Sequence, residues 1–311
     1  IEIVSMADIV GGDGVTLTSR GGGEVVVSSF GTQTFGDGLC VDVSAQPSVM
    51  FSYPDGGAGG RVVFQASEDQ TFGLLLKILA YGTNGTEGNS RGGNGGAGGS
   101  VLFEADGSQT VGSAQIEAQG GRGGNYVNGG GAGRDGGAVG FTAGGSQTLG
   151  AFSIMCQGGN GGSQSGGGDG GASGRGGRVE IESGAAQVVA DFTVFAAGGN
   201  GGSSDISGIP GKSGGQVILQ AVTSQGFTGA TAIDANGGAG GSSDFGTAGP
   251  GGSGGTVNFE SFAVGTAGSV SANGGSGGTG GNGGAVFYPP AVFTVTVNGA
   301  SPGGAMGTIV P

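Results

Sequence analysis

The sequence predicts an all-β fold, a β-solenoid of about eight rungs of about 38 residues, each with two short strands and two polyglycine segments. Three observations support this prediction. Glycine makes up 86 of the 311 residues, gathered in tracts such as GGNGGAGGS at 92–100. These tracts recur every 37–40 residues. The segments between them alternate apolar and polar residues with period two, which is typical of strands with one buried face.

Two independent markers keep the same phase along the chain. Glycine tracts that follow an apolar run start at Gly82, Gly120, Gly158, Gly198, Gly237 and Gly274. Glutamines that follow a shorter run lie at Gln33, Gln70, Gln109, Gln147, Gln187 and Gln225. Such a phase indicates a repeat protein and argues against a disordered Gly/Ser-rich linker. Collagen is excluded, because each triplet carries two glycines and the chain has only 8 prolines.

Each repeat predicts two strands. In the copy at 100–124 the inward residues are Val101, Phe103 and Ala105 in the first strand, and Ile116 and Ala118 in the second. Stacking at about 4.8 Å per rung would place like residues on like. We therefore expect the six glutamines to form a structural ladder with amide-to-amide hydrogen bonds. The alternative, that they only shape the turn, stays open.

The GGX triplets match an extended helix with three residues per turn, of the polyproline II type, which makes no internal hydrogen bonds. Only glycine lets such backbones approach closely enough to bond sideways. The third residue of each triplet is mostly small and polar, and we expect it to face water.

These tracts resemble those of a class of glycine-rich repeat proteins. The class includes the polyglycine II bundles at the adhesin tips of some phage tail fibres, the snow-flea type of antifreeze protein and the PGRS-like tracts of mycobacterial surface proteins. The resemblance covers the GGX tracts and not the strand pairs. It implies polyglycine II packing and an exported setting, and it does not imply a shared activity.

Composition narrows the function classes. With 22 acidic and 9 basic residues the net charge is −13, which argues against nucleic acid or an anionic membrane surface as partner. No segment approaches the roughly 18 apolar residues of a membrane span. The chain begins at Ile1 without methionine, as after removal of an export signal, so we expect a secreted, extracellular or cell-surface protein.

Catalytic chemistry has few candidates in this sequence. It contains no histidine, which removes the commonest general base and metal ligand. Glu104, Glu182 and Glu260 share the outward side of the first strand, but Thr142 and Gln220 separate them, so we interpret them as a solvated face. The glycine-rich stretch around Asp169, GGGDGGASG, lacks the tandem copies and the apolar anchor of a calcium repeat, and whether an ion binds stays open. We expect a protein that is not an enzyme and needs no cofactor.

Three further residues carry smaller predictions. Cys40 and Cys156 would lie three rungs apart, roughly 14 Å, which is too far for a disulfide. Cys156 would point inward and Cys40 outward. Asn84 begins an Asn-Gly-Thr pattern for N-glycosylation, which chance also explains in a chain of this composition.

The ends suggest the function. The chain divides into an N-terminal segment (1–23), repeats (24–284) and a C-terminal segment (285–311), in one domain. Apolar residues without a polar cap mark both ends as contact regions: Ile1, Ile3, Phe293, Val295 and Val297. Open strand edges that differ from one another favour head-to-tail contact between copies and hence filaments.

The leading hypothesis is therefore a structural subunit of an extracellular filament, which polymerises with itself through its terminal strands. One alternative is an adhesin tip whose loops between the glycine tracts bind a receptor or surface glycans. A third is ice binding by a column of exposed threonines, which breaks at Val188 and Gly226. The column consists of Thr34, Thr71, Thr110 and Thr148.

Overall fold

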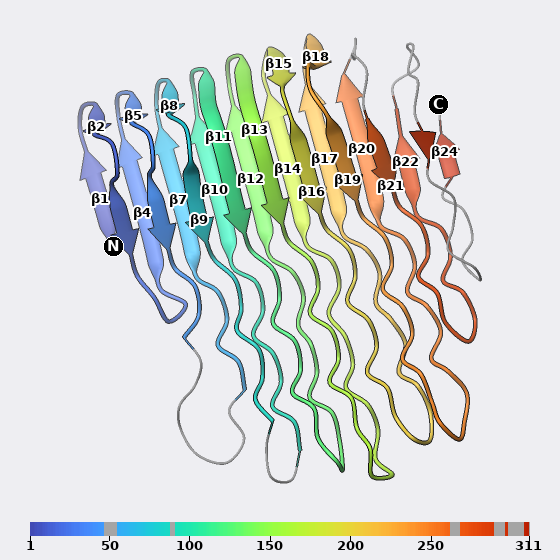
Figure 1. Ribbon diagram of the computed structural model, residues 1–311. Helices are drawn as coiled ribbons and strands as arrows, with labels where there is room; N and C mark the ends of the chain where they lie inside the picture. Colours follow the sequence, from blue (N-terminus) through green and yellow to red (C-terminus); the bar gives the residue numbers. More distant parts are fainter. Residues whose placement is uncertain (47–54, 88–90, 262–267, 289–295, 298–307, 311) are drawn as a thin grey trace.

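The chain forms a parallel β-solenoid in which two sheets lie face to face and a glycine-rich layer extends from one edge of them (Figure 1). This computed structural model describes residues 1–46, 55–87, 91–261, 268–288, 296–297 and 308–310. Their regular secondary structure consists of strands. Within these residues no helix is long and apolar enough to cross a membrane. The all-β solenoid predicted from the sequence is confirmed.

The first run of each repeat builds a ten-stranded parallel sheet, in which each strand pairs with the same run of the neighbouring repeats. Its strands, in spatial order, are β1 (Glu2–Ser5), β4 (Glu24–Ser29), β7 (Arg61–Ala66), β10 (Ser100–Ala105), β12 (Ala138–Ala143), β14 (Arg178–Ser183), β17 (Gln216–Ala221), β20 (Thr256–Ser261), β22 (Ala285–Phe287) and β24 (Thr308–Val310).

The second run builds a fourteen-stranded sheet, in which most repeats contribute two short strands. The strands that begin with the glutamine are β5 (Gln33–Phe35), β8 (Gln70–Phe72), β11 (Gln109–Glu117) and β13 (Gln147–Met155). The equivalent strands of the other repeats are β2 (Ile9–Gly11), β15 (Ala186–Val189) and β18 (Ser224–Phe227). The strands that lead to the glycine tracts are β3 (Thr16–Thr18), β6 (Cys40–Asp42), β9 (Leu76–Leu79), β16 (Phe192–Phe195), β19 (Thr231–Asp234), β21 (Ser269–Ser271) and β23 (Thr296–Val297). In β11 and β13 the two runs merge into one nine-residue strand.

The number of rungs differs from the prediction of about eight. About six turns with the full spacing connect β4 to β20. The glutamines of successive turns are 37, 39, 38, 40 and 38 residues apart. The end turns are shorter. The Thr32 amide bonds to Asp8, only 24 residues earlier, and Thr308 pairs with Ala285. Dividing the chain by a uniform repeat missed that these turns lack the long glycine segments.

The apolar core lies between the two sheets, and its side chains stack in columns as the alternation predicts. Phe64, Phe103 and Phe141 occupy equivalent positions on neighbouring strands, and each is fully buried. Their rings stack, with 4.6 Å between the centroids of Phe103 and Phe141. Phe72, from the opposite sheet, packs edge-on against Phe103 at 5.1 Å. Offset and edge-on aromatic contacts of this kind add to the large apolar area that each ring buries.

The glycine-rich layer consists of two sublayers, because each repeat runs outward from the second sheet and then returns to the first. Along one sublayer, hydrogen bonds recur every third residue. Gly120 and Gly123 donate to the next repeat, at 2.9 Å from the carbonyls of Gln157 and Asn160. This is the three-residue period expected of packed polyglycine II segments.

The intervening glycines bond across to the other sublayer. Gly121 and Gly124 donate to the carbonyls of Gly96 and Gly93, on the returning segment of the preceding repeat, at 2.7 and 2.8 Å. Gly131 then donates to Gly124 at 2.8 Å. An added Cβ at Gly121 or Gly124 would overlap a backbone carbonyl oxygen of the preceding repeat. Close approach of backbones is therefore the reason for glycine at these positions.

The third residue of the triplet does more than face water. Asn160 and Asn200 are exposed, but each Oδ1 accepts a hydrogen bond from the backbone amide at the equivalent position of the next repeat. These bonds measure 2.8 and 2.7 Å. Asn84 acts in the same way toward the Arg122 amide, at 2.8 Å. Short amide side chains thus satisfy backbone donors that the glycine network leaves free.

Candidate functional sites at the ends and along one face

The six glutamines form a continuous chain of buried hydrogen bonds. Their side chains are 0–2% exposed. Nε2 of Gln70, Gln109, Gln147 and Gln187 donates to Oε1 of the preceding glutamine at 3.1, 2.8, 2.7 and 2.6 Å, and Gln225 donates to Gln187. At the first rung Gln33 donates to the backbone carbonyls of Val27 and Gln65. The ladder fixes the register of the stack and is closed to solvent, so it is a structural element.

The N-terminal end of the stack exposes apolar side chains. Among the described residues, β1 pairs only with β4, and β2 only with β5. Ile3 lies beside Val27, at the end of a core column, yet is 37% exposed. Ile1, directly before β1, is 47% exposed. Val10 is 78% exposed but lies on the outer side of its sheet, in register with the exposed Thr34, so it is not part of the core. The core therefore continues to this end without a polar cover.

The C-terminal end is described in part. Val297 lies on β23, in register with the buried Val270 of β21. Phe293 and Val295 lie outside the described residues. Within the described part of the chain, β24 pairs only with β22 and β23 only with β21, so these are the last strands of the two sheets. Figure 1 places the two ends of the chain at opposite ends of the stack.

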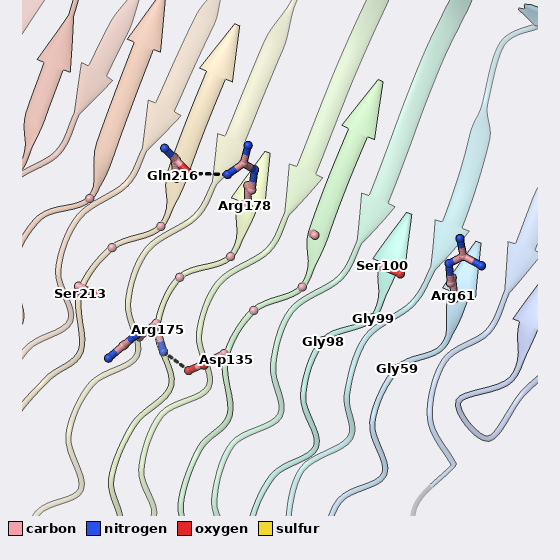
Figure 2. A pocket seen from close by; sticks show the side chains of 18 of the residues that line it. Gly59, Arg61, Gly98, Gly99, Ser100, Asp135, Arg175, Arg178, Ser213 and Gln216 are labelled. Carbon is pink, nitrogen blue, oxygen red and sulfur yellow. Dashed lines mark hydrogen bonds between the residues drawn. The ribbon is translucent and has the colours of Figure 1, made fainter. Parts of the chain in front are cut away.

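A groove of about 1210 Å³ runs along the stack where the chain passes from the glycine layer into the ten-stranded sheet (Figure 2). We call it the axial groove. One row of its lining residues starts the strands: Glu24, Arg61, Ser100, Ala138, Arg178, Gln216 and Thr256. A second row comes from the glycine layer: Asp135, Arg175 and Ser213. Glycine pairs join the two rows: 59–60, 98–99, 136–137, 176–177, 214–215 and 254–255.

The charges of the axial groove are largely compensated. Arg61 Nη1 lies 2.5 Å from Glu24 Oε1. Arg178 Nη2 lies 2.5 Å from Glu180 Oε1, and its Nη1 donates to Gln216 at 3.0 Å. Asp135 Oδ1 accepts the backbone amide of Arg175. The groove therefore presents polar groups without a strong field of one sign.

The outward glutamates lie in one column, as the sequence predicts, with Thr142 and Gln220 between Glu104, Glu182 and Glu260. Burial, together with the neighbouring Glu180 carboxylate, raises the pKa of Glu182. The other charged groups that act on Glu182 are Arg178, which lowers its pKa, and Glu260, which raises it. Among the described residues no cluster of histidine, cysteine, aspartate or glutamate could hold a metal ion.

The threonine column is present in register on the second sheet. Thr34, Thr71, Thr110 and Thr148 are exposed and paired in sequence, and Val188 and Gly226 follow. A single column four residues long offers a narrow surface. It leaves ice binding as an untested alternative.

Both cysteine thiols are free in the structure. Cys156 is fully buried, and burial raises its pKa to about 12. Cys40 is partly exposed on the outer side of β6, beside Lys77 of β9. Asn84 is exposed at the start of a glycine tract, and its Oδ1 already accepts a backbone hydrogen bond. Its glycosylation stays a prediction.

One ionic cluster fixes the loop before β4. Arg20 Nε donates to Asp42 Oδ2 at 2.6 Å, and the Ser44 hydroxyl donates to Asp42 Oδ1 at 2.6 Å. Burial tends to raise the pKa of the Asp42 carboxyl. The hydrogen bonds from Ser44 and Arg20 outweigh burial and hold that pKa below its ordinary value.

Sequence reasoning missed the axial groove. Its position depends on the angle between the sheet and the glycine layer, which no local pattern reveals. One signal was available: each glycine tract ends in a glycine pair directly before the first strand. The chain matches no protein-family model, and no curated protein or solved structure is significantly similar to it.

Proposed function

We propose that this protein is a structural subunit that joins end to end with further copies of itself into an extracellular filament. The observation that carries the proposal is the uncovered apolar core at the N-terminal end. Repeat proteins that stay monomeric need terminal repeats with a polar outer face. Here Ile3 continues a core column and is 37% exposed.

The geometry of the strands supports a head-to-tail joint. Both sheets are parallel along the whole described stack, and their outermost strands at the two ends differ. A parallel pairing of β24 or β23 of one copy with β1 or β2 of the next would continue the same ladders. Such heterologous contact does not close on itself, so it produces an open filament.

The shortness of the end turns also fits this arrangement. The turn from β1 to β4 spans about two thirds of the usual repeat, because it lacks the long glycine segments. The sheets therefore extend beyond the glycine layer at this end. Two copies could bring their sheets together without a clash between their glycine layers. Nothing in this role requires catalysis, and an exported setting is what the resemblance of the glycine tracts implies.

Electron cryomicroscopy of the purified chain at neutral pH tests the proposal. We expect filaments much longer than a single stack, with strands spaced at about 4.8 Å across the joints. A charge at the joint should prevent them, because lysine on an edge strand opposes pairing. We therefore expect Ile3→Lys to remain as short single rods.

Val188→Lys is the matched control. Val188 is similarly exposed, at 40%, but lies on a middle strand away from both ends. This variant should assemble like the unmodified chain. Short rods for the unmodified chain at high concentration would contradict the proposal. So would filaments that Ile3→Lys leaves unchanged.

A further inference from the structure

The axial groove is long, regular and open to solvent. Its lining spans the strand starts from Glu24 to Thr256, seven strands of the ten-stranded sheet, which corresponds to a length of about 30 Å. An aromatic side chain is absent from the lining. Because its chemistry repeats once per rung, the groove suits an extended ligand that lies along the stack.

The floor of the groove contains a row of free hydrogen-bond acceptors. The first glycine of each pair is partly exposed and the second is buried. Since glycine has no side chain, the exposed atoms of the first glycine are main chain. Within the described residues, no donor bonds to the carbonyls of Gly98, Gly136, Gly176 or Gly214. By contrast, the second glycine of a pair accepts a bond from the next strand, as Gly99 does from Ala138 at 3.1 Å.

Donors flank this row of acceptors. Ser100 and Gln216 start their strands along one side, and Ser213 lies on the other (Figure 2). Thr256, which also lines the groove, starts the strand β20. The backbone amide of Ser213 also has no acceptor within the described residues. A ligand in the groove would therefore meet a row of acceptors with donors on both sides of it. Equivalent positions of successive rungs are about 4.8 Å apart along the stack.

We propose that the axial groove binds a neutral linear polysaccharide lying along the stack. A hydroxyl group both donates and accepts, so a chain of sugar residues can satisfy the carbonyl row and the flanking donors together. The glycine floor lets such a chain approach the backbone closely. This binding site is separate from the end strands, and the filament proposal does not depend on it.

The charges argue for a neutral chain over an anionic one. Arg61 and Arg178 are already paired with Glu24 and Glu180. Arg175 is in no ion pair within the described residues, but the carboxylate of Asp135, which accepts its backbone amide, lines the same side of the groove and offsets its charge. An anionic polymer would also face the carbonyl row, which carries partial negative charge. The net charge of −13 adds a long-range repulsion.

Biolayer interferometry with immobilised polysaccharides tests the proposal. The probes are a soluble β-glucan, a linear mannan and, as an anionic counterpart, alginate. We expect binding to at least one neutral polymer and weaker binding to alginate. Ala138→Trp and Ser213→Trp fill the groove from its two sides, because both side chains line it. Each should raise the apparent Kd at least tenfold.

Thr110→Trp is the matched control. Thr110 is exposed on the other sheet, outside the groove, so this variant should bind like the unmodified chain. Circular dichroism and a cooperative melt establish that each variant folds. If one of the two groove variants does not fold, the other is enough for the test. The proposal would be overturned if the chain bound neither of the neutral polymers or bound alginate more strongly than both. An equal loss of affinity in Thr110→Trp would also overturn it.

Discussion

The two halves of each repeat reach order by different means. The sheets bury large apolar side chains, such as Phe103 and Ile116, which are fully inaccessible to solvent. The glycine layer buries almost only backbone. The second glycine of a pair donates to one segment and accepts from another, as Gly121 does with Gly96 and Arg134, whereas the first glycine, such as Gly120, only donates. Ordering a residue costs about 1–2 kcal/mol of backbone entropy, and more for glycine than for any other residue.

This difference shows which half depends on the other. The sheets would retain their apolar core if the glycine tracts were shortened. The turn from β1 to β4 is an example, because it lacks the long glycine segments and its strands still pair. The glycine segments contain no comparable core, so their register comes from the strands at both of their ends. The comparison predicts that small changes have unequal effects in the two halves. All four tests below use the Ile3→Lys chain, so that assembly does not add to the measured stability.

The largest effect for the size of the change is expected for Gly162→Ala, which adds a single carbon atom. A Cβ at this position would overlap the carbonyl oxygen of Gly124, on the preceding repeat. Backbone on both sides prevents relaxation, and we expect a loss of more than about 3 kcal/mol in the free energy of unfolding. Denaturant titration measures it. Gly129→Ala is the control, because its Cβ would meet no atom within 4 Å. Equal stability of the two variants would show that the glycine layer is loose.

In the sheets, Phe103→Ala should cost about 3–5 kcal/mol, because it leaves a cavity in the middle of the aromatic column. Phe103 contacts Phe64, Phe72 and Phe141 at centroid distances of 4.6–5.2 Å. Leu102→Ala, on the outer side of the same strand, should cost much less. Thermal melts followed by circular dichroism compare them. Similar losses would mean that the core is not packed as described.

Gln109→Leu tests the glutamine ladder, which lies inside the sheets, at the start of the strands that follow the turn from the first sheet to the second. It removes the acceptor of Gln147 and the donor to Gln70, both of them buried. A buried polar group without a partner costs about 1–3 kcal/mol, so we expect a loss of about 2–3 kcal/mol. Gln115→Leu, at an exposed position of the same strand, is the control. A neutral result for Gln109→Leu would leave the glutamines as turn residues only.

The smallest effect concerns pH. The pKa of Asp42 is lower in the folded chain than in the unfolded chain, so its contribution is present above the unfolded pKa. That contribution is lost as the pH falls through the folded pKa. At pH 7 Asp42→Asn should cost about 1 kcal/mol, and at pH 2 the variant and the parent should melt alike. A difference that persists at pH 2 would assign the loss to packing.

The sequence alone predicted the parts of this structure that repeat. The period-two runs placed Val101, Phe103 and Ile116 in the core, and the phase of Gln70 and Gln109 predicted their contact. Each is a local pattern that stacking simply multiplies. The rung count failed, since the prediction extended the full spacing to the ends, where the turns are short.

The candidate sites were less predictable. The apolar residues Ile1 and Ile3 could be picked out in the sequence as a possible contact region, and the structure shows Ile3 exposed beside the core residue Val27. The axial groove depends on how two layers meet and on which carbonyls remain unbonded. Neither property follows from the residue types of Gly98 or Gly136, which the sequence does not distinguish from other glycines.

Hydrogen exchange tests the central claim most directly, that backbone hydrogen bonds order the glycine layer as firmly as apolar packing orders the sheets. Mass spectrometry would compare peptides covering 119–125 and 130–137 with one covering β11. We predict strong protection in all three, lost together on global unfolding. Glycine peptides that exchange as fast as an unfolded chain, beside a protected β11, would contradict the account.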